Sequence, residues 1–362
     1  MLRALAAEHQ FTVFSVQFEN PCPDRIEWVR IPAPTRPLAL LFVAFHLLAP
    51  IYYAFYRLRK RQRFDVVQFV ESNLSFGDVC YAHFCHTTYL KEHWKEGKSS
   101  GLRGFFRKLD HALHAAMERV TFRRAQKIVV PSRGLAKELS QAFPFTVRKI
   151  QVISNAVDVD GLGRPASFDR AGFRSEFGFG TQDAVFLFAA LGQFERKGLP
   201  LLLEALKDVD SGRTKLMVVG GEPDLVASYR DKARSLGLNG AVVFTGMRSD
   251  VRPYLWSADA FVLPSSYETF SLVAYEAAAA GLPVIAPRLN GIDELLREGE
   301  NGYAIDRTRE QVASALKTFT VLPEDKRAAM GRRASAAAAE YNPAQFERKW
   351  RLFYNEWISG PK

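Results

Sequence analysis

Apolar segments that end in or beside glycine or proline recur through the second half of the chain and alternate with stretches of helical pattern. Five of them occupy residues 186–191, 215–221, 242–248, 260–264 and 283–287. Short apolar runs bounded in this way predict buried strands, and helices between them imply parallel pairing. The alternation therefore predicts an α/β fold with a doubly wound parallel sheet.

A chain of 362 residues with 48% hydrophobic and 24% charged residues is typical of a globular protein with two domains. Asn155, Gly161 and Pro165 follow a predicted strand at residues 150–153 and indicate a linker. We predict a first domain over residues 1–154 and a second over residues 155–342. Residues 343–362 carry aromatic side chains at helical spacing and predict a final helix.

Two carboxylates stand eight residues apart at a predicted strand-to-helix junction. Glu268 is expected in the loop and Glu276 about two turns into the helix, which ends at Gly281. The unpaired amides of a helix N-terminus can bind phosphate. They belong here to Thr269, Phe270 and Ser271. A pair of helix carboxylates can also be a plain solvated face.

Residues 186–206 predict a strand, a glycine-containing loop and an apolar helix, which is a layout of phosphate sites. Gly192, Arg196 and Lys197 fall in the predicted loop. A guanidinium and an ammonium there can neutralise the charge on a departing diphosphate. Such a pair is often only solvated, but its place between strand and helix favours binding.

Together these segments resemble the Glu-x7-Glu motif and the Arg-Lys-Gly triplet of retaining, nucleotide-sugar-dependent glycosyltransferases of family 4. The resemblance runs from about residue 60 to the C-terminus and is greater to bacterial lipopolysaccharide-core and glycolipid hexosyltransferases. It implies a GT-B fold, with two doubly wound Rossmann-like domains facing a cleft and the last helix crossing back to the first domain.

The resemblance also implies roles for individual residues. Glu268 would contact the donor sugar and Glu276 the nucleotide ribose, while Arg196 and Lys197 would stabilise the leaving diphosphate. The family places its base pocket after the third strand of this domain. That position corresponds here to Gly246, Met247 and Arg248. Gln193 stands where the family usually has arginine, so no phosphate contact is carried over to it.

A histidine or aspartate near the acceptor hydroxyl is a further feature of the family. The predicted strand at residues 79–84 is followed by His86, Thr87 and Thr88, which makes His86 the better positional match and His83 the second. Histidine can orient or accept a proton because its ordinary pKa lies near neutrality. A lone histidine is also a common structural residue.

Two patterns suggest metal ligands. Asp158-Val159-Asp160 has the Asp-x-Asp form, but its place in the linker favours a helix cap or hinge. Histidine pairs at zinc-compatible spacing lack a Cys-x-x-Cys partner. They involve His83, His86, His93, His111 and His114. We predict no metal and no cofactor, with the nucleotide sugar as donor substrate.

Residues 38–56 form a charge-free apolar run, followed by a basic block at residues 57–63. The run is barely long enough to span a bilayer and contains Pro50. Three interpretations stay open, namely a helix packed in the domain, a helix on a membrane surface, and a membrane span. The basic block suits anionic lipid headgroups or solvent.

The first domain lacks the opening strand and glycine-rich loop of the family, because the chain begins in what resembles the following helix. Residues 11–16 predict the next strand. No signal peptide is visible at Met1, and three cysteines suit a reducing compartment, so we expect a cytoplasmic protein, with a peripheral position at the inner face of the membrane as the alternative.

An amphipathic helix is predicted over residues 106–124, with an apolar stripe facing the core. The stripe comprises Phe106, Leu109, Leu113, Met117 and Val120. Basic residues on the same helix add to a formal net charge of +10, which suits an anionic acceptor or membrane. No motif for nucleic acid accompanies this charge.

The predicted function is a metal-independent, retaining hexosyl transfer from a nucleoside-diphosphate sugar to a glycan or glycolipid acceptor. One alternative is a nucleotide-sugar epimerase of the same fold. The other, suggested by the missing first strand, is a shortened non-catalytic protein that binds sugar nucleotides or membranes.

Overall fold

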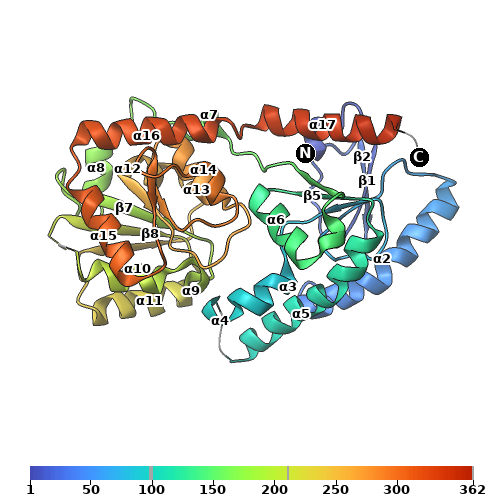
Figure 1. Ribbon diagram of the computed structural model, residues 1–362, viewed down its shortest axis with the longest axis horizontal. Coiled ribbons are helices and arrows are strands. Elements are labelled where there is room, and N and C mark those ends of the chain that lie inside the picture. Colours follow the sequence, from blue (N-terminus) through green and yellow to red (C-terminus); the bar gives the residue numbers. More distant parts are fainter. Residues whose placement is uncertain (98–100, 210–211, 361–362) are drawn as a thin grey trace. The chain divides into compact units, whose positions relative to one another are not determined.

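The computed structural model describes residues 1–97, 101–209 and 212–360, and the chain separates into two compact units. Unit 1 comprises Met1–Trp94, Ser99–Ser154 and Ala344–Lys362, and unit 2 comprises Lys95–Lys98 and Asn155–Pro343. Figure 1 shows a sheet flanked by helices in each unit.

Unit 2 contains a six-stranded, wholly parallel sheet in the order β12-β11-β10-β7-β8-β9. Its strands are β7 (Ala184–Ala189), β8 (Thr214–Val219), β9 (Val242–Gly246), β10 (Ala260–Val262), β11 (Val284–Ala286) and β12 (Gly302–Ala304). The predicted doubly wound parallel sheet is confirmed, because the strand order runs outward in both directions from β7 and β10. Ligands in sheets of this kind bind beyond the carboxyl ends of the strands where the order reverses.

The helices of unit 2 bury the sheet between them, as right-handed crossovers on both sides of β7 require. Helix α10 packs against α15, and α13 packs against α16. These helices are α7 (Val159–Leu162), α8 (Arg170–Ser175), α9 (Phe194–Lys197), α10 (Leu199–Leu206), α11 (Pro223–Ser235), α12 (Arg252–Ser257), α13 (Leu272–Ala279), α14 (Ile292–Leu295), α15 (Arg309–Thr320) and α16 (Glu324–Ala339).

Unit 1 contains a four-stranded parallel sheet, β3-β4-β5-β6, and a separate parallel pair, β1-β2. Its strands are β1 (Phe11–Ser15), β2 (Ile26–Arg30), β3 (Gln68–Val70), β4 (Val79–Tyr81), β5 (Lys127–Val130) and β6 (Ile150–Val152). Its helical segments are α1 (Leu2–Leu5), α2 (Leu38–Lys60), α3 (His86–Thr88), η1 (Tyr89–His93), α5 (Gly101–Arg124), α6 (Arg133–Ala142), η2 (Pro144–Thr146) and α17 (Pro343–Ser359), and α4 (Trp94–Gly97) straddles the division between the units.

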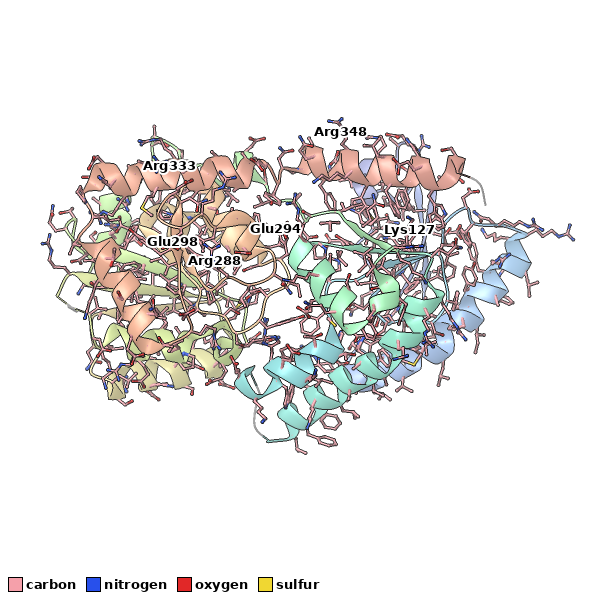
Figure 2. The ribbon with its side chains drawn as sticks, in the orientation of Figure 1. Lys127, Arg288, Glu294, Glu298, Arg333 and Arg348 are labelled. Carbon is pink, nitrogen blue, oxygen red and sulfur yellow. The ribbon has the colours of Figure 1, made fainter. Side chains whose placement is uncertain are left out.

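The last helix, α17, packs on unit 1 although 188 residues of unit 2 precede it from Asn155 to Asn342. Trp350 is fully buried and lies in one core cluster with Leu5, Val79 and Val129. Arg348 lies on the opposite, outward side of the helix (Figure 2). Both ends of the chain therefore contribute to the core of unit 1.

The prediction that an apolar stripe forms the core face of α5 is wrong. Phe106 and Val120 are about 40% exposed. The buried face carries polar residues instead, among them Asp110, His114, Glu118 and Thr121. The backbone amides of His86 and Thr87 donate to the Glu118 carboxylate at 2.5 and 2.9 Å, and His114 Nδ1 lies 2.9 Å from Ser72 Oγ. Hydrogen bonds of this kind allow polar side chains to be buried. A face buried in this way cannot be recognised from the spacing of apolar residues.

Candidate functional site

The two loops that follow β7 and β10 come together at the carboxyl edge of the unit 2 sheet, where the strand order reverses. Gly198 lies in the left-handed region at φ +82°, and an added Cβ would lie 2.0 Å from the Pro264 carbonyl oxygen. The Ser266 amide donates to the Arg196 carbonyl at 2.8 Å. Two segments about 70 residues apart in the sequence are thus held in direct backbone contact.

Arg196 and Lys197 lie in the short helix α9, which corrects their predicted place in a loop. The turn is possible because Gln193 and Gly198, on either side of it, both adopt positive φ. Arg196 Nη1 donates to the Tyr267 carbonyl at 2.6 Å, and its Nε donates to Gln193 Oε1 at 2.7 Å. Gln193 therefore orients the arginine.

Lys197 and Glu268 form an ion pair with 2.7 Å between Nζ and Oε1. Their side chains are 15% and 6% exposed, respectively. Because each charge depends on the other in this partly desolvated position, loss of one partner would leave an uncompensated charge. The structure brings together the predicted diphosphate-binding lysine and the predicted sugar-binding carboxylate.

The N-terminus of α13 leaves the side chain of its N-cap residue without a hydrogen-bond partner. Ser271, its N-cap, has φ +65°, and its side chain makes no capping hydrogen bond. The buried Ser271 Oγ has no hydrogen-bond partner among the described residues. An N-cap serine side chain normally accepts a bond from an amide of the first turn. Here the Ala274 amide donates to the Ser271 carbonyl at 2.9 Å instead, so the hydroxyl stays available beside the positive end of the helix dipole. This combination suits an oxyanion.

Neighbouring residues hold that helix start in place. Phe270 is buried and stacks on Tyr275 at 4.2 Å between ring centroids, and the Tyr275 hydroxyl donates to the Gly291 carbonyl at 2.7 Å. Gly291 has φ +80°, and an added Cβ would approach the Phe270 Cα to 2.4 Å. Thr269, between the buried Glu268 and Phe270, is half-buried.

Glu276 is the fifth residue of α13, about one turn from its start instead of the predicted two. Its side chain is half-buried, and burial raises the pKa of the carboxyl. Of the remaining predicted donor-site residues, Gly192 precedes α9, and Gly246 ends β9 at φ +72°. Met247 is 48% exposed.

Arg248 follows Met247, and its guanidinium lies over the Tyr254 ring at 5.8 Å from the centroid. Its loop follows a strand of the same parallel sheet, so it leaves the same edge as the loops after β7 and β10. All predicted donor-site residues therefore belong to unit 2 and to segments that follow its parallel strands.

The predicted acceptor-side histidines lie in unit 1. His86 begins α3 and is buried, with its Nδ1 2.9 Å from Nδ1 of His111 and its ring stacked on His114 at 4.3 Å. Burial and the two neighbouring rings lower the pKa of His86 to about 2. The imidazole is therefore neutral at physiological pH. His83 is more exposed, and burial lowers its pKa to about 4.

Two residues hold His86 and the following turn: Glu118, which the sequence did not indicate, and His111, which it indicated only as a possible zinc ligand. Burial raises the pKa of Glu118 to about 7, although three hydrogen bonds from His86 and Thr87 oppose that rise. The available signal was the helical spacing of His111, His114 and Glu118, which places them near one face of α5.

Neither pattern of possible metal ligands forms a cation site. Asp158 caps α7, with its side chain accepting a hydrogen bond from the Gly161 amide. In residues 1–97, 101–209 and 212–360, no group of three or more His, Cys, Asp or Glu side chains is arranged to hold a metal ion.

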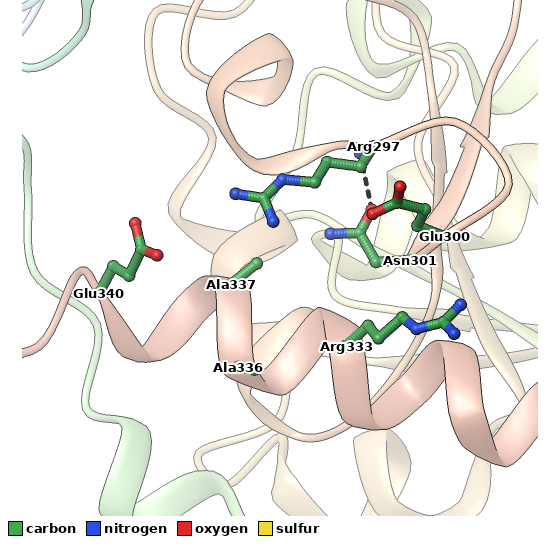
Figure 3. A pocket seen from close by; sticks show the side chains of 7 residues that line it. All are labelled: Arg297, Glu300, Asn301, Arg333, Ala336, Ala337 and Glu340. Atoms are coloured by element: carbon green, nitrogen blue, oxygen red, sulfur yellow. Dashed lines mark hydrogen bonds between the residues drawn. The ribbon is translucent and has the colours of Figure 1, made fainter.

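A separate pocket of about 160 Å³ opens beside α16 (Figure 3). Two arginines and two glutamates line it, so its charge favours neither anions nor cations. The lining residues are Arg297, Glu300, Asn301, Arg333, Ala336, Ala337 and Glu340. None of the predicted site residues is among them.

Two family models match successive parts of the chain. Residues 184–320 match the family described as Glycosyl transferases group 1, and residues 1–160 match Glycosyltransferase Family 4. Among curated proteins, the lipopolysaccharide core biosynthesis glycosyltransferase LpsE of Rhizobium meliloti is 35% identical over 186 residues, which is 51% of each chain. An uncharacterized glycosyltransferase of Methanocaldococcus jannaschii is 28% identical over 66% of this chain and 62% of its own length.

The chain thus spans between half and two thirds of the length of these curated relatives. Among solved structures, WaaG, a glycosyltransferase involved in lipopolysaccharide biosynthesis, superimposes with a TM-score of 0.74 over 99% of this chain and 93% of its own, at 21% identity. Anabaena HepE in complex with UDP-glucose gives a TM-score of 0.69 over 96% of this chain and 100% of its own, at 18% identity. These similarities confirm the predicted GT-B fold.

Proposed function

Since the chain belongs to the family 4 and group 1 glycosyltransferases of the GT-B fold, we propose that it transfers a hexose from a nucleoside-diphosphate sugar to a glycan or glycolipid, with retention at the anomeric carbon. The observation that carries this proposal is the meeting of α9, Glu268 and the unsatisfied start of α13 at one edge of the unit 2 sheet. The names of LpsE and WaaG point to an acceptor in envelope polysaccharide or glycolipid synthesis.

Transfer breaks the bond between the anomeric carbon and the diphosphate oxygen, and the bonding electron pair stays on that oxygen. Arg196, Lys197 and the first amides of α13 are assigned to the charge that develops there, since fixed donors at a leaving group supply much of such catalysis. The two cationic side chains can neutralise the diphosphate charge that a divalent ion neutralises in other enzymes, so the proposed reaction uses no metal and no cofactor. The oxygen of the acceptor hydroxyl forms the new bond on the face the diphosphate leaves, and its proton passes to the departing diphosphate oxygen. No carboxylate nucleophile is assigned.

Glu268 is assigned to hydroxyls of the donor sugar and Glu276 to the ribose. His86, with His83 beside it in the sequence, is assigned to the acceptor side. The Met247 and Arg248 backbone is assigned to the base. The protein would act in the cytoplasm, at the inner face of the cell membrane where a glycolipid acceptor is available.

The proposal is tested by incubating the protein with UDP-, GDP- and ADP-glucose, each with and without a truncated lipopolysaccharide core as acceptor. We expect an acceptor product whose new glycosidic bond has the anomeric configuration of the donor, as determined by NMR. An isomerised sugar nucleotide with no acceptor product would establish the epimerase alternative instead. An inverted linkage would contradict the retaining assignment.

The two carboxylates should separate in their effects on ligand binding. Glu276→Gln should weaken binding of the bare nucleoside diphosphate and of the sugar donor by a similar factor of about 10–100, because it removes a charged hydrogen bond to the ribose. Glu268→Gln should not weaken binding of the bare nucleoside diphosphate, because it leaves Lys197 free to contact the diphosphate, and should weaken binding of the sugar donor relative to the bare nucleotide. Calorimetric titration of both ligands measures the contrast. Equal losses for both ligands in both variants would show that the roles are misassigned.

A further inference from the structure

Helix α2 is apolar on two sides, and only one of them packs against the rest of unit 1. Its inner side is buried and comprises Ala39, Phe42, Ala49 and Tyr56. Its outer side carries large apolar side chains that are between 42% and 79% exposed, at the three- and four-residue spacing of a single helical stripe. We call this stripe the outer row; it comprises Leu40, Val43, Leu47, Ile51, Phe55 and Leu58.

The inner side of α2 is held firmly against unit 1. The Tyr56 hydroxyl donates to Glu27 Oε2 at 2.6 Å, and the Phe42 ring lies 4.4 Å from that of His114. By length and composition α2 is long and apolar enough to cross a membrane. Crossing would require lipid around its whole circumference and would break these contacts, so the structure favours a helix with one face toward lipid.

A basic cluster stands at the end of the outer row, where α2 finishes. Its exposed members are Arg57, Arg59, Lys60, Arg61 and Arg63. Lys60 lies 3.4 Å from Glu27, and across the described ranges no acidic partner occurs for the four arginines. The cluster therefore has at least four cations available for an external anion.

We infer that α2 lies in the plane of a bilayer surface that contains anionic phospholipids, with the outer row in the acyl boundary and the basic cluster on headgroup phosphates. Amphipathic helices bind interfaces through this combination of apolar area and positive charge. A second copy of the chain fits less well, because a two-fold contact would present the same surface again. No acidic residue lies on α2 and Glu27 is already paired with Lys60, so the arginines would have no counter-charge.

This inference rests on the peripheral location in the proposed function, but it does not depend on sugar transfer. Its test uses binding alone, so a failure of either can be recognised separately. The full chain is sedimented with phosphatidylcholine vesicles, with and without about one third phosphatidylglycerol, over a salt series. We expect pelleting with the anionic vesicles at low salt and release as the Debye length shortens to about 3 Å near 1 M salt.

Three variants locate the contact. Replacing all five basic residues with glutamine should weaken binding to anionic vesicles by at least ~100-fold, at about fivefold per cation. Leu47→Glu with Ile51→Glu should weaken it to a similar degree by placing charge in the acyl boundary. Val321→Glu with Leu352→Glu changes two other exposed apolar residues by the same net charge and should stay within about twofold of wild type. Circular dichroism melts should match for all variants.

Several outcomes would overturn the inference. These are no binding to anionic vesicles at low salt, equal binding by all variants, or retention in carbonate at high salt, which would indicate a span. A dimer in vesicle-free solution that Leu47→Glu abolishes would assign the outer row to a second copy.

Discussion

Replacing Arg196 and Lys197 together with alanine should abolish measurable turnover. Each residue is assigned to the departing diphosphate, and loss of one fixed donor costs about 10²–10³ in kcat. Initial-rate measurements with saturating donor and acceptor would show the loss. Wild-type-like kcat/KM in the folded double variant would end the diphosphate-binding assignment.

The ion pair adds a stability effect that must be separated from catalysis. Lys197→Ala leaves the Glu268 carboxylate buried without its partner, which typically costs about 3–5 kcal/mol. Lys197→Met with Glu268→Gln removes both charges at similar volume, so we expect it to recover most of the stability and none of the turnover. Lys326→Ala with Arg332→Ala removes two exposed cations of α16 and should leave both quantities unchanged.

Gly198→Ala should inactivate the protein and strongly destabilise unit 2. The new Cβ would meet the Pro264 carbonyl oxygen at 2.0 Å, and alanine disfavours φ +82°. Left-handed backbone costs about 1–2 kcal/mol and overpacking about 1–3 kcal/mol more. The loops that hold Lys197 and Glu268 must then separate, so we expect activity to fall by more than ~10²-fold.

Gly237→Ala is the matched control for the cost of placing alanine in left-handed backbone. Gly237 has φ +76°, but an added Cβ would meet nothing within 4 Å. The Gly237→Ala variant should therefore lose only about 1–2 kcal/mol of stability to unfolding. Thermal unfolding and activity assays on both variants measure the difference. Equal destabilisation, with activity retained in Gly198→Ala, would show that the close approach of the two loops does not matter for the site.

Much of unit 2 could be predicted from its sequence because several of its strands are buried apolar runs followed closely by glycine or proline. β7 and β10 are examples, with every residue of both buried. The turn of α9 could not be predicted in this way, since it depends on Gln193 adopting a positive φ that few residues other than glycine favour. The Lys197–Glu268 pair depends on contact between two loops that local patterns do not connect.

Prediction was weakest in unit 1, where buried polar side chains line one face of α5. The buried face of α5 contains His114 and Glu118, which a hydrophobic stripe excludes, and its exposed face contains Phe106 and Val120, which a stripe includes. The three interpretations of residues 38–56 depended on surroundings that the sequence does not contain. The structure leaves one face of that helix buried and the other exposed.

The packing of α17 on unit 1 has a consequence for synthesis. Unit 2 is nearly continuous in the sequence, from Asn155 to Pro343, and can fold as soon as it leaves the ribosome. Unit 1 is made first, but its core cluster of Leu5, Val79 and Val129 closes only when Trp350 arrives. The first part of the chain to be translated is therefore the last to complete its fold, and its apolar surfaces stay open to chaperones or to lipid until then.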